Sequence, residues 1–225
     1  MKMLHYNIHG WRDANGVDNV DRVTDLIKNH DPDVVSLVEV DEPWGRPSSL
    51  QQLADRLGHH WAFVPAFEYR EEGGFGNALL SRTPFQSVQQ WQLLPPSLYD
   101  GTEPSEPRAL LLGQVDWNGN PISIGTTHFP RGSASMRAIA AARTLELLSE
   151  LDEAWILAGD FNQPSSAWLD GSQHHVSPVA AATYPASTPV EAIDYCITAS
   201  LEIEADVVAD PDPSDHLALL IRAQL

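Results

Sequence analysis

The stretch Trp155-Ile156-Leu157-Ala158-Gly159-Asp160-Phe161-Asn162 joins a short apolar run to an acidic and an amide side chain. The run has the length and character of a buried β-strand. A strand holds its last residues rigidly, and positions i and i+2 of an extended segment share one face. Asp160 and Asn162 are therefore predicted to point toward a common functional site. An Asx turn after the strand is the structural alternative.

The same pattern recurs along the whole chain. Ser214-Asp215-His216 directly precedes the apolar run Leu217-Ala218-Leu219-Leu220-Ile221. Further polar side chains stand at the ends of expected strands, at Asn7, Glu39, His128 and Asp194. A single carboxylate at a strand end is often a turn former or a helix cap. Their joint occurrence predicts the site of a metal-dependent phosphoester hydrolase.

Hydrophobic periodicity predicts an α/β protein with many strands. Expected strands cover residues 3–8, 33–38, 61–67, 76–81, 109–115, 122–127, 154–158, 192–198, 203–208 and 217–223. Expected helices cover residues 17–29, 50–57 and 133–151. The inner face of the longest helix is predicted to carry Met136, Ile139, Ala140, Leu147 and Leu148. Helices alternate with strands early and strands dominate the middle, which favours two packed sheets flanked by helices.

The length of 225 residues suits one large domain or two small ones. We expect a single domain over residues 1–225, because the candidate site residues come from both ends of the chain. The Pro-rich loop over residues 93–107 is the candidate linker. Residues 1–6 are too short and polar for a signal peptide, and no apolar run approaches the roughly 18 residues of a membrane span. Cys196 is the only cysteine, which suits a reducing compartment, so we expect a cytoplasmic protein.

The chain is strongly acidic. It has 13 Lys and Arg residues against 31 Asp and Glu residues, a net charge of -18, and its lysines are Lys2 and Lys28. Proteins that grip duplex DNA without sequence preference use many Lys and Arg contacts to phosphates. The charge therefore disfavours a nucleic-acid partner, although a bound metal can screen a local site. Solubility or a high-salt habitat is the alternative explanation of the charge.

Taken in chain order, these motifs resemble those of the endonuclease/exonuclease/phosphatase superfamily, which includes DNase I, exonuclease III and the neutral sphingomyelinases. The similar segments are Asn7, Val38-Glu39-Val40, Gly76-Asn77-Ala78-Leu79-Leu80-Ser81-Arg82, Thr127-His128-Phe129, Gly159-Asp160-Phe161-Asn162, Ile193-Asp194-Tyr195 and Ser214-Asp215-His216. The resemblance spans nearly the whole chain. It implies a four-layer α/β/β/α sandwich of two packed mixed sheets, with the site at one edge.

Hard oxygen ligands suit Mg²⁺ or Mn²⁺, and the sequence has no Cys/His cluster for zinc. Glu39 is the best single ligand, since it is a carboxylate at the end of an apolar strand. Asn7 and Asp215 are expected to complete or support the metal shell. The resemblance assigns the activation of water to Asp160, and Asn162 is expected to hold the phosphate.

The resemblance also implies roles for two histidines and an arginine. His216 and Asp194 are similar to the family's His–Asp pair, in which the carboxylate favours the charged imidazole. His128 resembles the second histidine of the DNase I-like branch and is expected to protonate the leaving oxygen. Arg108 resembles an arginine near the site and is expected to contact the substrate phosphate, with a structural ion pair as the alternative.

The preferred interpretation is a phosphodiesterase that acts on a small or lipid-linked substrate by in-line attack of water. A nuclease with the same machinery is one alternative, and a catalytically silent binding domain is another. The chain lacks the long basic insertions of relatives that cut duplex DNA, which favours a small substrate. Three tryptophans follow site strands and are expected either to form an apolar pocket wall or to pack in the core: Trp11, Trp44 and Trp168.

Overall fold

Two six-stranded sheets form the centre of the protein, whose computed structural model describes residues 1–44, 48–69, 72–94, 107–169, 175–176 and 181–224. The strand order of the first sheet is β11 (Glu202–Val208), β12 (Ala218–Gln224), β1 (Lys2–Asn7), β2 (Val34–Pro43), β4 (Gly73–Ser81) and β3 (His60–Glu68). The second sheet runs in the order β5 (Ser87–Gln92), β6 (Ala109–Trp117), β7 (Asn120–His128), β8 (Ala154–Asp160), β10 (Asp194–Ala199) and β9 (His175–Val176).

Both sheets are mixed. In the first sheet β1 pairs in parallel with β2 and antiparallel with β12. In the second sheet β8 pairs in parallel with β7 and antiparallel with β10. The parallel pairs bring strand ends that carry polar residues to the same edge of each sheet.

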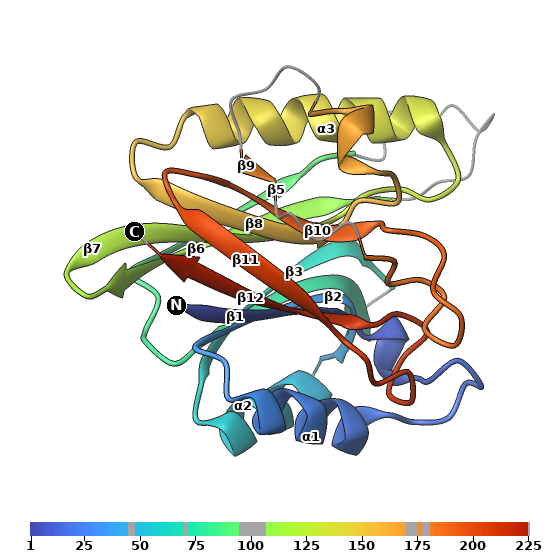
Figure 1. Ribbon diagram of the computed structural model, residues 1–225. Helices are drawn as coiled ribbons and strands as arrows, with labels where there is room; N and C mark the ends of the chain where they lie inside the picture. The colour runs from blue at the N-terminus through green and yellow to red at the C-terminus, as the bar shows by residue number, and fades with distance from the viewer. Residues whose placement is uncertain (45–47, 70–71, 95–106, 170–174, 177–180, 225) are drawn as a thin grey trace.

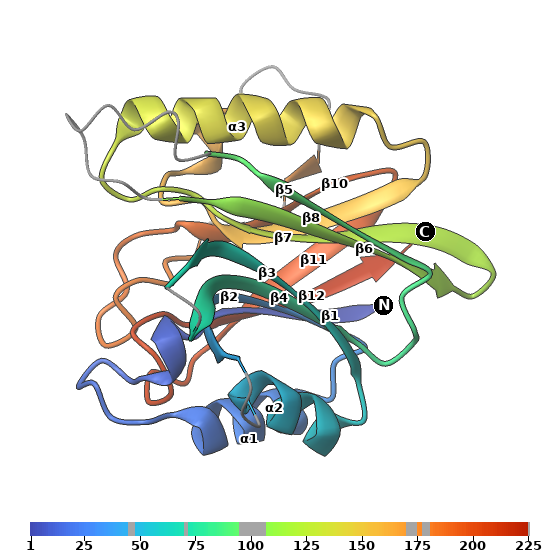
Figure 2. The same ribbon diagram turned by 180° about the vertical axis from the view of Figure 1, so that it is seen from behind.

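Helices cover the outer faces of the sheet pair. α1 (Val20–His30) and α2 (Ser49–Leu57) lie on the outer side of the first sheet, and α3 (Ala134–Ser149) lies on the outer side of the second (Figures 1 and 2). The layers are therefore helix, sheet, sheet, helix. This confirms the α/β/β/α sandwich that the sequence predicted.

Three hydrophobic clusters fill the spaces between these layers. They arise because successive side chains of a strand alternate between the two faces of its sheet. Met3 and Val34 lie in the cluster between the sheets, whereas their neighbours Leu4 and Val35 face the cluster beneath α1 and α2. In the second sheet Ile156 faces the inter-sheet cluster and its neighbour Leu157 faces α3. Successive side chains of a strand point to opposite faces, so a strand that is covered on both sides reads as a continuous apolar run.

All three expected helices are present, with α2 within one residue of its predicted bounds, whereas α1 begins three residues later and α3 ends two residues earlier than predicted. Ser48 caps α2 by accepting a hydrogen bond from the backbone N–H of Gln51, and Gly58 ends it in the left-handed conformation. One prediction for α3 is wrong, because Ile139 is 41% exposed. The buried stripe of this helix is made by Ala140, Ala141, Thr144, Leu147 and Leu148. Ile139 lies about 100° around the helix from Ala140, on the side away from that stripe.

Other differences concern strands. The strand expected to end at Glu39 continues as β2 to Pro43, through an irregularity at Glu39 itself. β5 was missed because it is an edge strand whose residues are mostly exposed, so it lacks an apolar alternation. The backbone of His175 and Val176 forms the short β9, which the sequence did not predict. Most of the candidate linker, residues 95–106, lies outside the described residues.

Within the part of the chain that the structure describes, none of the helices is both long enough and apolar enough to pass through a lipid bilayer.

Candidate active site

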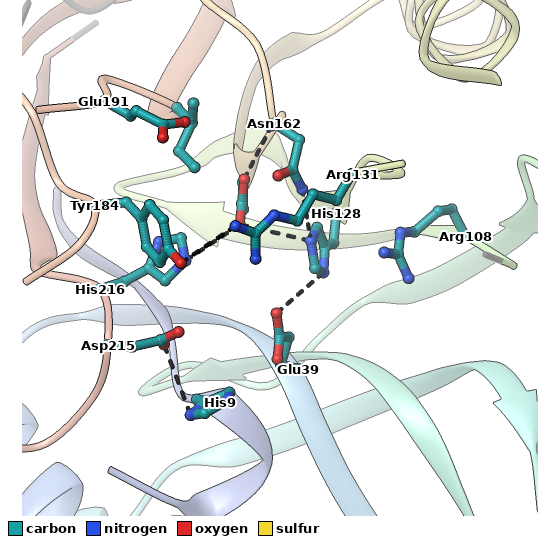
Figure 3. Close-up of a pocket in the computed structure, with 12 residues that line it drawn as sticks. His9, Glu39, Arg108, His128, Arg131, Asn162, Tyr184, Glu191, Asp215 and His216 are labelled. Carbon is teal, nitrogen blue, oxygen red and sulfur yellow. Dashed lines mark hydrogen bonds and ion pairs between the residues drawn. The ribbon is translucent and has the colours of Figure 1, made fainter. Parts of the chain in front are cut away.

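A pocket of about 310 Å³ lies at the edge where the polar strand ends of both sheets meet (Figure 3). Its described lining is almost entirely polar and consists of His9, Glu39, Arg108, His128, Arg131, Asp160, Asn162, Tyr184, Glu191, Ile193, Asp215 and His216. The remaining predicted site residues, Asn7 and Asp194, are buried behind this lining and contact it. The structure thus brings together every residue that the sequence placed in the site.

Asp160 lies at the end of β8, in the middle of the side chains that the second sheet contributes to the pocket. It lies opposite His128 of β7 on one side and opposite Asp194 of β10 on the other. Its Oδ1 accepts a hydrogen bond from the backbone N–H of Asn162 at 2.9 Å, and its Oδ2 accepts one from Asn7 Nδ2 at 3.1 Å. Burial raises the pKa of Asp160 to about 7, with a contribution from the charge of Asp194. A carboxylate with this pKa suits a general base near neutral pH.

Glu39 reaches the pocket from a bulge in β2. The pairing between β2 and β4 shifts register between Leu37 and Val40, and Glu39 has a φ of 58°. An extra residue in one strand changes the direction in which a nearby side chain points, and such bulges often occur next to active sites. The bulge therefore explains why β2 continues to Pro43 while Glu39 still points into the pocket.

Asn7, at the end of β1, links the two carboxylates. Its Nδ2 donates to Glu39 Oε1 at 3.0 Å and to Asp160 Oδ2 at 3.1 Å, and lies 3.5 Å from His216 Nε2. Its Oδ1 accepts a hydrogen bond from the backbone N–H of His9 at 3.1 Å. With this orientation Asn7 holds the Glu39 carboxylate in place, while its own oxygen is directed at the backbone N–H of His9.

His216 and Asp194 form a buried ion pair. His216 Nδ1 donates to Asp194 Oδ2 at 2.8 Å, and His216 Nε2 lies 3.7 Å from Asp160 Oδ2. Burial alone disfavours the charged imidazole, but the adjacent Asp194 raises the pKa of His216 to about 10. Burial also opposes the charge of the carboxylate, yet His216 holds the pKa of Asp194 below its usual range. His216 is therefore a cation at neutral pH.

His128 is in the opposite state. Burial lowers the pKa of His128 well below its ordinary value, and the charges of Arg108 and His216 add to this effect. Asn162 Nδ2 donates to His128 Nε2 at 3.0 Å and to the carbonyl of Phe129 at 2.9 Å. His128 is therefore neutral with its hydrogen on Nδ1. A neutral ring can donate a hydrogen bond but is a poor proton source, and the Asn162 amide nitrogen is already engaged by protein groups.

The donor set fits a divalent cation. The side chains of Glu39 and Asp215 are 23% and 24% exposed, and both line the pocket with carboxylate oxygens, which Mg²⁺ and Mn²⁺ prefer. Among the described residues, one ligand atom each from Glu39, His128 and Asp160 lies within 4.8 Å of the others, and the same holds for Asp160, Asp194 and His216. The cluster could therefore hold a metal ion.

The three tryptophans do not form a wall of this pocket. Trp11 is buried beside α1 and donates from Nε1 to the carbonyl of Asp41 at 3.0 Å. Trp168 packs against Phe129 and Phe161 beneath α3, and Trp44 is 42% exposed away from the pocket lining. The core alternative is thus the correct one for Trp11 and Trp168. An apolar wall for a lipid chain is absent from the described lining, where Ile193 is the aliphatic member.

Five lining residues were missed by the sequence analysis: His9, Arg131, Tyr184, Glu191 and Ile193. His9 follows Asn7 by two residues and Arg131 follows His128 by three, so proximity to site strands was a usable signal. Tyr184 and Glu191 are brought in by a hairpin in which their backbones pair. The Tyr184 ring lies 4.7 Å from the His216 ring, and its hydroxyl accepts a hydrogen bond from Arg131 Nη2 at 3.3 Å. Arg108 approaches from the opposite side (Figure 3).

Gly159 permits the close approach of β7 and β8 beside the site. A Cβ at this position would lie 2.5 Å from the carbonyl oxygen of Thr127, which is backbone and cannot rotate away. We expect Gly159→Ala to lower the free energy of unfolding by about 1–3 kcal/mol in urea denaturation, because the strands must separate. It should also lower kcat, because the separation moves His128 relative to Asp160.

Gly125→Ala is the matched control within β7. A Cβ there meets the methyl groups of Leu112 and Leu157 at 2.7 Å, and these are ends of flexible side chains far from the site. We expect a stability loss without a change in kcat per folded molecule. Wild-type kcat in Gly159→Ala would show that the strand spacing does not control the site.

Comparisons with known proteins agree with this architecture. The model of the endonuclease/exonuclease/phosphatase family matches residues 4–216. No curated protein sequence matches the chain. Several solved structures have a fold similar to that of this chain. An endonuclease/exonuclease/phosphatase from Beutenbergia cavernae is 22% identical, with a TM-score of 0.79 and coverage of 100% of this chain and 71% of that one.

Two further structures are similar to the same extent. A mannosyl-6-phosphatase from Bacteroides thetaiotaomicron is 17% identical, with a TM-score of 0.80 and coverage of 100% of both chains. The catalytic domain of human Nocturnin with bound sulfate is 18% identical, with a TM-score of 0.77 and coverage of 100% of this chain and 93% of that one. At these identities the likeness shows the fold, and the family match over most of the chain shows the membership. The chain belongs to the endonuclease/exonuclease/phosphatase family, whose members are phosphoester hydrolases.

Proposed function

We propose that this protein is a divalent-metal-dependent hydrolase of a small, hydrophilic phosphodiester. The observation that carries the proposal is the convergence of four side chains on one pocket. These are the carboxylates of Glu39 and Asp215, the buried Asp160, and the cationic His216. Clustered carboxylates repel one another without a cation, so folding alone does not account for them.

The pocket supports a small and hydrophilic substrate. Its volume of about 310 Å³ is at the lower end of small-molecule sites. Apart from Ile193 and the ring of Tyr184, its described lining is polar and offers little surface for an acyl chain, which argues against the lipid-linked substrate. Four lining carboxylates, Glu39, Asp160, Glu191 and Asp215, repel a dianionic monoester more than a monoanionic diester.

The proposed roles follow from the contacts. Asp160 accepts a proton from the attacking water, held in place by the Asn162 backbone and the Asn7 amide. A bound divalent cation, held by Glu39 and Asp215, would neutralise charge on the phosphoryl and departing oxygens. His216 presents a cation to the phosphate and gives the leaving oxygen the proton of Nε2. The 3.7 Å between His216 Nε2 and Asp160 Oδ2 lets Asp160 return a proton to the ring afterwards.

The remaining residues position the substrate. His128 donates a hydrogen bond from Nδ1 to a phosphoryl oxygen, in place of the acid role that the sequence suggested. Asn162 fixes the His128 ring through Nε2. Arg108 and Arg131 line opposite sides of the pocket and are proposed to contact the phosphate and the leaving group, respectively (Figure 3).

We also propose that residues 1–225 act as one domain, since both sheets contribute side chains to the same pocket. Cys196 is buried between the sheets, which agrees with a reducing compartment, and we propose a cytoplasmic location.

A metal-dependent activity panel tests the function. We expect hydrolysis of bis-p-nitrophenyl phosphate with Mg²⁺ or Mn²⁺, loss of activity in chelator, and weaker hydrolysis of p-nitrophenyl phosphate, phospholipid and plasmid DNA. The acidic surface repels a polyanion, and the repulsion is strongest at low salt, so plasmid is assayed at several salt concentrations.

Each other outcome of the panel identifies a competing function. Plasmid cleavage at nanomolar enzyme, abolished in Asp160→Asn, would identify a nuclease. Faster hydrolysis of the monoester would identify a phosphatase. A folded, metal-loaded protein that is inactive on every substrate would be a binding domain.

A further inference from the structure

His5 is a buried histidine that does not line the pocket. It lies on β1 two residues before Asn7 and is 1% exposed. Its Nδ1 is 2.9 Å from Ser36 Oγ on β2, and Ser36 Oγ is 2.9 Å from Thr126 Oγ1 on β7. Its Nε2 points the other way, toward Asp194 on β10. The ring therefore bridges the two sheets behind the active site.

The contact between His5 and Asp194 joins two polar atoms that have no other partner. His5 Nε2 and Asp194 Oδ1 are both buried, are 3.6 Å apart, and make no hydrogen bond to any residue in the described ranges. The other oxygen of Asp194 is occupied, because Oδ2 accepts from His216 Nδ1 at 2.8 Å and from the hydroxyl of Thr183. Buried polar atoms in native proteins are almost always paired, and the 3.6 Å between these two exceeds the length of a hydrogen bond by only a few tenths of an ångström.

The chemistry of the two groups decides where the hydrogen lies. A carboxylate oxygen offers lone pairs only, so the hydrogen between Asp194 Oδ1 and His5 must be on Nε2. The Ser36 hydroxyl donates its hydrogen to Thr126 Oγ1, so it accepts one from His5 Nδ1, and the contact with Asp194 requires a hydrogen on the second ring nitrogen as well.

We propose that His5 is a positioning residue for the active site, which donates a hydrogen bond from Nε2–H to Asp194 Oδ1. Asp194 is then held through both oxygens, by His5 from β1 on one side and by His216 and Thr183 on the other. Fixing both oxygens fixes the plane of the carboxylate. That plane sets the direction of His216, whose Nε2 faces Asp160. Groups behind a functional side chain act in this way on its orientation.

The location of the hydrogen can be measured without any assay of activity. In protein labelled with ¹⁵N-histidine, two-bond ¹H–¹⁵N correlation spectra distinguish a protonated ring nitrogen from a bare one. We expect His5 Nε2 to be protonated, with the signal assigned by its loss in His5→Gln. A bare Nε2 on His5 would overturn the proposal. This result stands even if the protein hydrolyses no phosphoester, so it is separate from the proposed function.

Two substitutions separate positioning from simple packing. The amide nitrogen of a glutamine can occupy the place of Nε2, whereas that of an asparagine can occupy the place of Nδ1. We expect His5→Asn, which keeps the Ser36 contact and loses the Asp194 contact, to lower kcat by about 10–100-fold with KM within about twofold. His5→Gln should retain kcat within about threefold of the wild type.

The His216 Nδ1–H resonance provides a second readout for these variants. It should move in His5→Asn and stay near its wild-type position in His5→Gln. Equal kcat losses in the two variants, or wild-type kcat in a folded His5→Asn, would overturn the positioning role. Ser36→Ala is the control for the Nδ1 contact, and it should leave the His216 resonance in place. If His5→Asn does not fold, the protonation state of His5 Nε2 in the wild-type protein decides.

Discussion

Asp160→Asn is expected to lower kcat by about 10²–10⁴-fold, the usual contribution of a general base, while the protein stays folded. The amide has nearly the same size and can still accept the backbone hydrogen bond from Asn162, but it cannot take a proton from water. It also removes one of the two carboxylates that contact Asn7. Steady-state kinetics with saturating Mn²⁺ on bis-p-nitrophenyl phosphate, together with circular dichroism, provide the measurement.

Asp206→Asn is the matched control. Asp206 is an exposed aspartate on β11 that pairs with Arg222, and it is not part of the pocket lining. An exposed ion pair contributes about 0–1 kcal/mol to stability, so kcat should not change and the unfolding midpoint should barely move. Turnover at the wild-type rate in Asp160→Asn would remove Asp160 from the role of base, whatever the result for the control.

Glu39→Gln is expected to weaken metal binding and catalysis together. Glutamine keeps the acceptor for Asn7 Nδ2 and the size of the side chain, but it removes the negative charge at the bulge of β2. Affinity for hard cations depends on the number of charged oxygen ligands, so Mn²⁺ binding in calorimetry should weaken by more than about tenfold. A metal supplies several kcal/mol of transition-state stabilisation, so kcat at subsaturating Mn²⁺ should fall by about 10²–10⁴-fold.

Glu191→Gln controls for charge in the same pocket. Glu191 lines the pocket on the hairpin side and belongs to neither candidate group of metal ligands within the described residues. Removing its charge should leave Mn²⁺ affinity within about twofold of the wild type. Equal losses in both variants would mean that the pocket attracts the cation through its general field, and unchanged affinity in Glu39→Gln would place the metal elsewhere.

Two buried carboxylates share one charge arrangement with His216. Asp160 and Asp194 are both buried beside His216, and a single imidazolium stabilises both carboxylates. Asp194 makes the direct hydrogen bond and has its pKa lowered, while Asp160 is farther away and has its pKa raised to about 7. When the environments of two neighbouring carboxylates shift their pKa values in opposite directions, the two groups have different roles. Asp194 supports the cation, and Asp160 is free to exchange a proton.

Much of the fold followed from the pattern of residues. The run Val34 to Val38 is apolar except for Ser36, because both faces of its sheet are covered, and this requires layers of helices outside the sheets. The edge strand β5 was not predicted, because most of its residues are exposed and its sequence therefore has no apolar pattern. The exposure of Ile139 on α3 was also not predicted, because an apolar residue can lie on either the buried or the exposed face of a helix.

The sequence by itself determined the architecture and which strand ends carry polar groups, because burial periodicity and rigid strand ends are local properties. The charged imidazole of His216 was expected from its resemblance to a His–Asp pair, whereas only the tertiary structure decided the neutral state of His128 and the contacts of the site residues. The neutral state of His128, the cationic state of His216 and the bridge from His5 to Asp194 depend on burial and on partners far apart in the chain. The physical reason is that the pKa and the hydrogen bonds of a side chain depend on the groups around it, and these groups come together only when the chain folds.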